Sequence, residues 1–389
     1  MTLAKKKANE VIPQYSLTGD LLSFLRCGLQ YRYHNGSALP PSRPVQMWFG
    51  EFIHGVMENA YRIWSVNPPS FPWPYNPTPY RGSPPPGRLA HDVGTLGDVV
   101  ESTLLAQGKA PRSRETRESA YLRAERAINE LGPHLFPLIS SAEERVIGTR
   151  DVPAHAQSRA SLYELHGIID VLGSVKLGVA SGGNVLCEAI QAVCPSLKGD
   201  FEIIVDYKGS RRPRTDHPYW EHGDWQVQTY AWLRTRQPKA LPVVAGILLY
   251  VNELAPGTSG IVELKQEIAK GITDVVPANG DSDYYALSAW RPGAAVPALS
   301  PAFRMRRAIR VIPVNPASQQ LATAKFDNVV ADIETCVTAE AGSGKILQQW
   351  KSCGEEETCV ACDFRHFCPD RAPRSTGKKP SPPGAPETP

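Results

Sequence analysis

The spacing of apolar residues predicts several helices. Four leucines between positions 21 and 29 recur at helical spacing after Ser16 and Thr18, either of which can cap a helix that includes Cys27. Farther along, apolar positions repeat with a period close to 3.6 residues, so that one side of each segment is apolar. These further helices are expected at 48–64, 94–107, 115–131, 223–235 and 316–340.

Short runs rich in Val, Ile and Leu predict β-strands in the middle of the chain. A Gly-rich insertion at 173–200 is expected to form an elongated hairpin or an inserted loop, and 255–300 shows no clear pattern. Helices come first, and strands with a helix among them follow, which favours an α/β fold with a mixed sheet flanked by helices. The strands are expected at 145–148, 162–172, 201–207 and 243–251.

Composition divides the chain into six parts. The third part is marked by nine prolines between positions 67 and 87, which exclude a helix or a central strand there. The last part is rich in proline and is expected to be disordered. In order, the parts are a polar arm (1–14), a helical part with Cys27 and His54 (15–66), a Pro-rich insertion (67–92), a core with insertions (93–345), a cysteine motif (346–370) and a tail (371–389).

Length and charge narrow the class of protein. The chain has 389 residues, of which 42% are hydrophobic, so it can bury a sizeable core. No apolar stretch approaches the roughly 18 residues of a membrane helix, and no secretory signal is visible, so we expect a cytoplasmic protein without a membrane partner. A net charge of +3 implies no partner by itself, and contact with nucleic acid would require local basic patches.

Two apolar strands end in acidic residues. In the second, Asp206 and Lys208 point to the same side because side chains alternate along a strand. If the first strand is its neighbour, Asp170 converges with Asp206, and two carboxylates can bind Mg²⁺ or Mn²⁺. A lysine beside that ion can orient the attacking water in phosphodiester cleavage. The alternative is an ordinary ion pair at the end of a strand.

Three further residues could belong to this site. Gln226 and Tyr230 share one face of the helix after the second strand, although an ordinary amphipathic helix has the same pattern. His54 lies away from the apolar face of its helix, one turn after Gly50. It is either an exposed histidine or a further metal ligand, since neutral imidazole binds Mn²⁺.

Cysteines concentrate near the end of the chain. Cys359, Cys362 and Cys368 have the spacing C-x₂-C-x₅-C, which indicates a metal centre. His366 could complete a zinc site, or Cys353 could supply a fourth local thiol. Disulfides are the least expected use in a reducing compartment. Three other cysteines are expected to be structural or inert, namely Cys187, Cys194 and Cys336.

Basic and aromatic residues near Lys208 suggest contact with nucleic acid. Arg211, Arg212 and Arg214 follow the second acidic strand and could hold a phosphate backbone. Trp220 and Trp225 could stack unpaired bases or belong to the core. A second basic group consists of Arg304, Arg306, Arg307 and Arg310.

The order of these motifs resembles a known nuclease family. The resemblance covers about residues 16–369 and points to the RecB-like branch of the PD-(D/E)XK superfamily, closest to CRISPR-associated exonucleases and AddB-type nuclease domains with an iron–sulfur cluster. The 35-residue gap between Asp170 and Asp206 is longer than the family's usual short hairpin. The motifs are Gly50-x₃-His54, Gly167-x₂-Asp170, Asp206-Tyr207-Lys208 and Gln226-x₃-Tyr230.

The resemblance implies a restriction-endonuclease-like fold and a role for each motif. It implies that Lys208 is the catalytic lysine and that Gln226 and Tyr230 complete the site. An acid before the first strand, Glu143 or Glu144, would be the family's extra glutamate. The implied ligands of Mg²⁺ or Mn²⁺ are His54, Asp170, Asp206 and the carbonyl of Tyr207.

The resemblance also supplies Cys27 as a distant ligand. Together with Cys359, Cys362 and Cys368 it would hold a structural [4Fe–4S] cluster that joins the two ends of the chain, with Cys353 as the alternative fourth ligand.

We therefore expect a metal-dependent DNA nuclease, an exonuclease acting on single-stranded DNA or DNA ends. A helicase or an integrase is a candidate partner protein. Two alternatives are a non-catalytic DNA-binding or assembly subunit with a vestigial site, and a zinc-stabilised binding protein.

Overall fold

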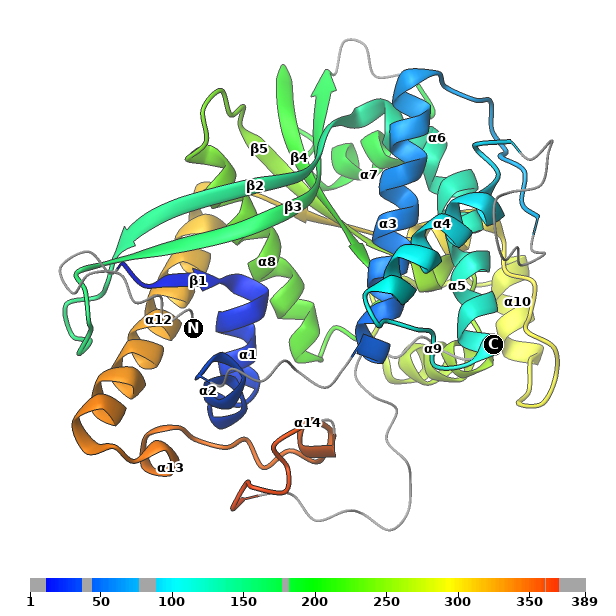
Figure 1. Cartoon of the computed structure of the whole chain (residues 1–389). Helices are drawn as coiled ribbons and strands as arrows, with labels where there is room; N and C mark the ends of the chain where they lie inside the picture. The colour runs from blue at the N-terminus through cyan, green and yellow to red at the C-terminus, as the bar shows by residue number, and fades with distance from the viewer. Residues whose placement is uncertain (1–11, 37–43, 77–88, 177–181, 361, 371–389) are drawn as a thin grey trace.

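The structure is a computed structural model that describes residues 12–36, 44–76, 89–176, 182–360 and 362–370 (Figure 1). The tail at 371–389, most of the polar arm and the centre of the Pro-rich insertion lie outside the described residues.

One mixed six-stranded sheet forms the centre of the molecule. Its order is β1-β3-β4-β5-β6, and β2 pairs with the other edge of the long strand β3. The pairs β1–β3 and β4–β5 are parallel and the others are antiparallel, which confirms the expected mixed sheet. The strands are β1 (Gln14–Ser16), β2 (Ile139–Asp151), β3 (Leu162–Lys176), β4 (Asp200–Lys208), β5 (Val243–Tyr250) and β6 (Ile309–Pro313).

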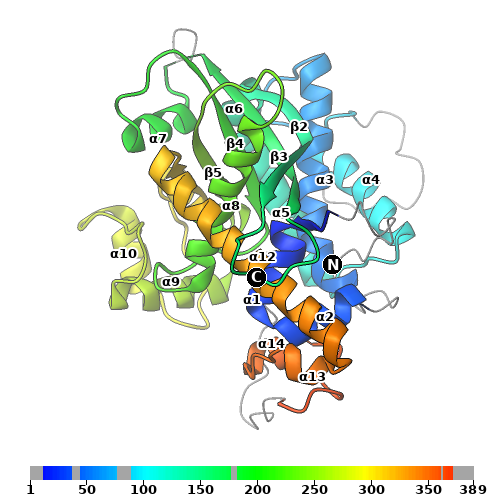
Figure 2. The ribbon, with the colours of Figure 1, turned by 90° about the vertical axis from the view of Figure 1, so that its left-hand side faces the viewer.

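Helices cover both faces of the sheet. Figure 2 shows the sheet between α3 (Pro44–Val66) on one side and α8 (Pro218–Thr235) with α12 (Pro316–Ser343) on the other. The remaining helices are α1 (Leu22–Arg26), α2 (Gly28–Gly36), α4 (Val93–Ala106), α5 (Arg114–Arg126), α6 (Gly132–Leu135), α7 (Val185–Val193), α9 (Thr258–Lys270), α10 (Ser282–Ala289), α11 (Pro301–Ala308), α13 (Ile346–Gln349) and α14 (Glu356–Val360).

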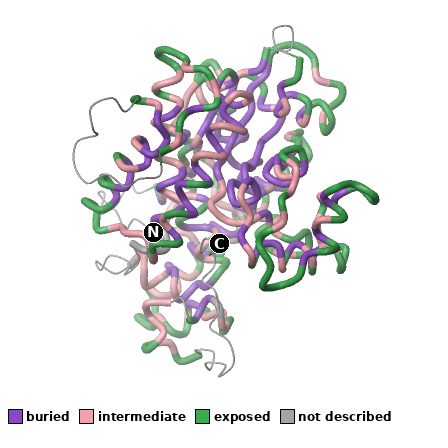
Figure 3. Tube along the Cα trace, turned by 90° about the vertical axis from the view of Figure 1, so that its right-hand side faces the viewer, coloured by how far each residue is buried: buried purple, intermediate pink, exposed green. Residues whose placement is uncertain are grey.

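Two large apolar clusters form the core, one on each face of the sheet. Val171, Val205 and Ile203 pack with α3, whereas Leu172 and Ile204 pack with α8 and α12. Buried residues accordingly gather in the sheet and its flanking helices (Figure 3). Within the described part of the chain, none of the helices combines the length and the apolar character needed to cross a bilayer.

The start of the chain differs from the expected single helix. Gln14 already belongs to β1, so the polar arm ends earlier than expected. Ser16 caps a π-helical turn at Leu17–Leu21, α1 ends at Arg26, and Cys27 is extended with φ −164°. The helix is broken because the chain docks on the C-terminal segment here, where the amide of Leu29 donates to the carbonyl of Lys351 over 2.9 Å.

The insertion at 173–200 does not separate the two acidic strands. β3 and β4 are longer than expected, and they pair from Val171–Val205 to Lys176–Asp200. Within the insertion the structure describes one helix, α7, whose first turn is capped by Asn184. The region 255–300, which had no clear pattern, contains α9 and α10. The short strands β1 and β6 were also not expected from the sequence.

A buried ion pair joins three distant parts of the chain. Glu334 of α12 is fully buried and accepts hydrogen bonds from Tyr15 of β1 and from Arg159 in the connection between β2 and β3. Burial acts to raise the pKa of Glu334, but the hydrogen bonds from Arg159 and Tyr15 outweigh it and lower the pKa. The carboxylate form is therefore stabilised in the folded state.

We predict that Glu334→Gln lowers the free energy of unfolding at pH 7 by about 2 kcal/mol, because the charged hydrogen bonds with Arg159 are lost. Since the folded pKa is lowered, this stabilisation is complete above the unfolded pKa of about 4.3 and is lost as the pH falls through the folded pKa. Urea unfolding of both proteins at pH 7 and near pH 3 measures the difference.

The control is Glu118→Gln, which removes an exposed ion pair with Arg114 and should cost less than about 0.5 kcal/mol. A Glu334→Gln deficit that is as large near pH 3 as at pH 7 would contradict the assigned role of the charge.

Candidate metal site and cysteine pocket

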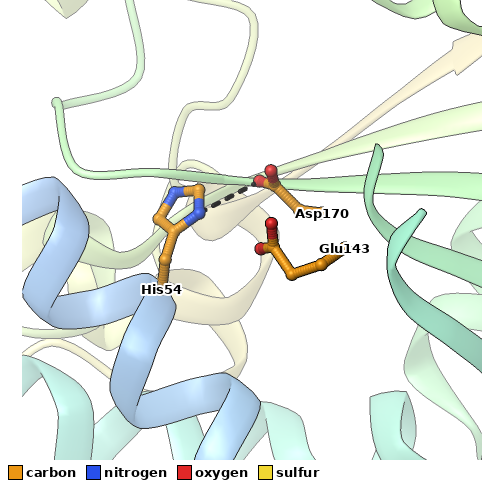
Figure 4. A group of neighbouring side chains, drawn as sticks. All are labelled: His54, Glu143 and Asp170. Atoms are coloured by element: carbon orange, nitrogen blue, oxygen red, sulfur yellow. Dashed lines mark ion pairs between the residues drawn. The ribbon is translucent and has the colours of Figure 1, made fainter. Parts of the chain in front are cut away.

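The ends of β3 and β4 bring the two acidic residues together. The β3–β4 ladder ends at Val171–Val205, so Asp170 and Asp206 follow at the next position of the two strands. The carboxylate of Asp170 accepts a hydrogen bond from the amide of Tyr207 over 3.1 Å. On the α3 side, His54 reaches the same place (Figure 4). The convergence of Asp170 and Asp206 expected from the sequence is therefore present.

Three side chains from α3, β2 and β3 form a candidate metal site. One ligand atom each of His54, Glu143 and Asp170 lies within 4.8 Å of the other two. His54 Nδ1 is 3.4 Å from Asp170 Oδ2, and its Nε2 is 2.9 Å from the carbonyl oxygen of Tyr207. The Tyr207 carbonyl thus borders the same pocket of about 260 Å³. Carboxylates, carbonyls and imidazole together form a donor set suited to Mg²⁺ or Mn²⁺.

The structure distinguishes between the two candidate glutamates. Glu143 points toward His54 and Asp170 (Figure 4) and has φ 54°, a left-handed conformation that is rare for glutamate. Glu144 points to the other face, where it pairs with Arg234 over 2.9 Å. The strained backbone at Glu143 therefore directs its carboxylate into the site, and strain of this kind clusters at functional positions.

Electrostatics at the site favour a bound cation. Burial, followed by the nearby charge of Asp206, raises the pKa of Asp170 to about 7. Burial also raises the pKa of Glu143, with Glu58 adding to the effect. A divalent cation stabilises the charged form of carboxylates whose pKa values are raised by burial and by nearby acids.

Asp206 belongs to a second, connected group on the α8 side. Its Oδ2 is 2.6 Å from Lys208 Nζ, and its Oδ1 accepts a hydrogen bond of 2.9 Å from Gln226. Lys208 also donates to the side-chain amide oxygen Oε1 of Gln226 over 2.5 Å. Burial lowers the pKa of Lys208, but Asp206 outweighs burial and the net pKa is raised, so the ammonium stays charged.

Asp206 therefore neighbours the three-residue site without being one of the three. The role of Asp206 as a metal ligand stays a prediction, and Glu143 occupies the place beside His54 and Asp170.

Tyr230 packs one turn after Gln226. Its ring lies against Gly167, where an added Cβ would be 2.7 Å from a ring carbon. Burial raises the pKa of Tyr230, and the charges of Asp206 and Asp170 add to this effect. The glycine of the Gly-x₂-Asp motif is thus required for the close approach of the tyrosine to the acidic strands.

Two of the arginines expected to contact nucleic acid are engaged inside the protein. Arg212 is buried and binds Asp274 together with the carbonyl oxygens of Arg307 and Ile309. Arg211 pairs with the acids of α9. Both guanidinium groups thus bind protein groups around the loop after β4, and their contact with a phosphate backbone stays a prediction.

Other basic and aromatic candidates are mostly structural as well. Arg214 is exposed and pairs with Asp216 over 3.0 Å. Arg310 lies 3.4 Å above the centre of the Trp220 ring and pairs with Asp224. Trp225 is buried and donates to a carbonyl of α12. Arg304 and Arg307 pair with Glu130 and Glu253. The tryptophans are thus already packed against protein groups.

Five cysteines line one pocket of about 350 Å³, and they are Cys27, Cys353, Cys359, Cys362 and Cys368. All five are free thiols. The pocket lies where α2 meets the C-terminal segment around α14 (Figure 1). Burial raises the pKa of Cys353 to about 12, and the neighbouring sulfurs of Cys27 and Cys359 add to the effect.

The remaining candidate ligands lie elsewhere. His366 is exposed and is not among the described residues that line the pocket, which disfavours the Cys₃His alternative. Cys187 belongs to the apolar core, and Cys336 donates to the carbonyl of Gln349. Cys194 contacts the carbonyl of Val244.

The chain matches no protein-family model, and no curated protein matches it.

We predict that Glu143→Gln weakens Mn²⁺ binding by about tenfold or more, because one of the three converging ligands loses its charge. The matched control is Glu144→Gln, whose side chain faces Arg234, and its Mn²⁺ affinity should stay within about twofold of the parent. Calorimetric titration with Mn²⁺ measures both. Equal losses in the two variants would contradict the assignment of Glu143 to the site.

Proposed function

We propose that this protein is a metal-dependent DNA nuclease with a restriction-endonuclease-like core. The observation that carries the proposal is the convergence of His54, Glu143 and Asp170 next to the Asp206–Lys208–Gln226 group. A half-buried lysine beside clustered acids fits metal-assisted phosphodiester hydrolysis, in which the acids hold the cation. The resemblance of the motifs to RecB-like PD-(D/E)XK nucleases supports the same reaction class.

Each side chain has a distinct role in the proposed reaction. A divalent cation held by His54, Glu143 and Asp170 would supply Lewis-acid stabilisation of the phosphate and lower the pKa of a bound water. Lys208, held charged by Asp206, positions the attacking water and offsets negative charge that develops on the phosphate. Gln226 fixes the geometry of Lys208 and Asp206 through its two hydrogen bonds.

The substrate is proposed to be single-stranded DNA or a DNA end, degraded exonucleolytically. This choice rests on the resemblance to CRISPR-associated exonucleases and AddB-type domains, whose motifs the chain contains in the same order. The same resemblance makes a helicase or an integrase the candidate partner.

We propose a structural [4Fe–4S] cluster in the cysteine pocket. A cluster takes four thiolates, and the pocket offers five thiols from two ends of the chain around an open space. We assign Cys27, Cys359, Cys362 and Cys368 as ligands, following the family spacing, with Cys353 as a neighbouring fifth thiol. The cluster would then fix α2 to the C-terminal segment, which the Leu29–Lys351 hydrogen bond already holds together.

We predict that the purified protein degrades end-labelled single-stranded DNA in the presence of Mn²⁺. Lys208→Ala should reduce the rate by about 10²-fold or more, because the ammonium next to the phosphate is lost. The control is Lys176→Ala, an exposed lysine at the far end of β3, which should leave the rate unchanged. Binding of DNA without any cleavage by the parent would instead favour a vestigial assembly subunit.

We predict that anaerobically purified protein is brown and holds about four irons per chain. Cys359→Ser and Cys27→Ser should lose the visible absorption and the iron, whereas Cys336→Ser and Cys353→Ser should keep both. Loss of iron in Cys353→Ser but not in Cys27→Ser would reverse the choice of fourth ligand. Zinc in place of iron by elemental analysis would contradict the cluster.

A further inference from the structure

The β2–β3 hairpin has one side that is packed and one side that is open. Val146 and Leu165 face α8 and α12 and are buried. Residues at the alternate positions are exposed, with Ile147 at 47% and Ile168 at 44% of their full accessible area. Figure 1 shows the hairpin reaching away from α3, above β1, α8 and α12.

The open side of the hairpin leads directly to the metal site. Its cross-strand pairs are Arg145–Ile168 and Ile147–His166. Arg145 is two residues from Glu143, and Ile168 is two residues from Asp170. Side chains two residues apart on a regular strand share a face and are separated by about 7 Å, which places Ile168 beside Asp170, whereas Glu143 enters the site through its left-handed backbone. A ligand on this face would therefore continue into the pocket of His54, Glu143 and Asp170.

The open side of the hairpin presents one positive charge next to apolar side chains, which suits a ligand in which charged and apolar groups alternate. Arg145 is exposed and makes no ion pair or side-chain hydrogen bond within the described residues. It is thus available for a phosphate, unlike Arg211 and Arg212. Ile147 and Ile168 are diagonal neighbours on adjacent strands and form an exposed apolar patch beside Arg145.

Other charged groups on the face are few. His166 is half-buried opposite Ile147, and Glu164 lies farther from the metal site, where its carboxylate accepts a hydrogen bond of 2.8 Å from Gln14. The cation nearest to the metal site on this face is therefore Arg145.

We propose that the open side of the β2–β3 hairpin binds an unpaired nucleic-acid strand and guides it to the metal site. Arg145 contacts a phosphate, and Ile147 with Ile168 contacts the faces of bases. The faces of bases are accessible in an unpaired strand and hidden in a duplex. The exposed apolar patch therefore favours binding of a single strand. This inference rests on the proposed nuclease function and names the path of its substrate.

The test is the binding of a fluorescein-labelled oligodeoxythymidine, followed by fluorescence anisotropy with Ca²⁺ in place of Mg²⁺ or Mn²⁺. Arg145→Ala should weaken binding by about fivefold or more and reduce the salt slope of the affinity by about one, whereas Arg145→Lys should keep the slope. Ile147→Ser combined with Ile168→Ser should weaken binding by about threefold or more without changing the slope.

Two exposed residues away from the site provide matched controls. Arg112→Ala removes an exposed arginine before α5, and Leu321→Ser removes an exposed leucine of α12, so neither should change the affinity. All substituted side chains are exposed, and thermal unfolding should confirm that every variant folds like the parent.

The outcomes separate the two proposals. If the parent binds the single strand and Arg145→Ala behaves like Arg112→Ala, the hairpin path is wrong while the nuclease proposal stands. A parent that binds a duplex of the same length more tightly than the single strand also overturns the path. A parent that binds neither nucleic acid overturns the proposed function itself.

Discussion

Two carboxylates that lie side by side, one buried and one half-buried, are the constraint on which the rest of the site depends. Asp206 and Asp170 lie where the β3–β4 ladder ends, and burial together with the charge of Asp206 raises the pKa of Asp170. Such a pair is tolerated only with compensating charge or hydrogen bonds. Lys208 and Gln226 compensate Asp206, whereas Asp170 faces His54 and Glu143, the place where a cation would be most favourable.

The backbone departs from regular geometry at the points where function is proposed. Glu143 has a left-handed conformation inside a strand, Gly167 admits the ring of Tyr230, and Cys27 interrupts two helices in an extended conformation. Each departure allows a side chain to reach a pocket that a regular strand or helix would not reach. Of these three, Glu143 has the strained φ angle that directs a ligand into the site, while the sheet supplies the rigid frame.

Charge in this protein serves mainly to join segments that are distant in sequence. Glu334 links α12 to β1, and Arg212 links the loop after β4 to Asp274 and to the carbonyl groups around β6. Arginines with internal partners are unavailable to a ligand. The arginines of the loop after β4 have such partners and Arg145 does not, so the proposed nucleic-acid contact is assigned to Arg145 on the hairpin.

Local periodicity and apolar runs were enough to predict the main helices, the acidic strands and the mixed sheet, because these features depend on neighbouring residues. The sequence also indicated His54, Asp170, Lys208 and Gln226 as neighbours through the order of their motifs. It could not distinguish Glu143 from Glu144, since a strained φ angle leaves no mark in composition. The choice of Glu143, the break at Cys27 and the burial of Arg212 became visible in the folded chain alone, because each depends on contacts between residues far apart in the sequence.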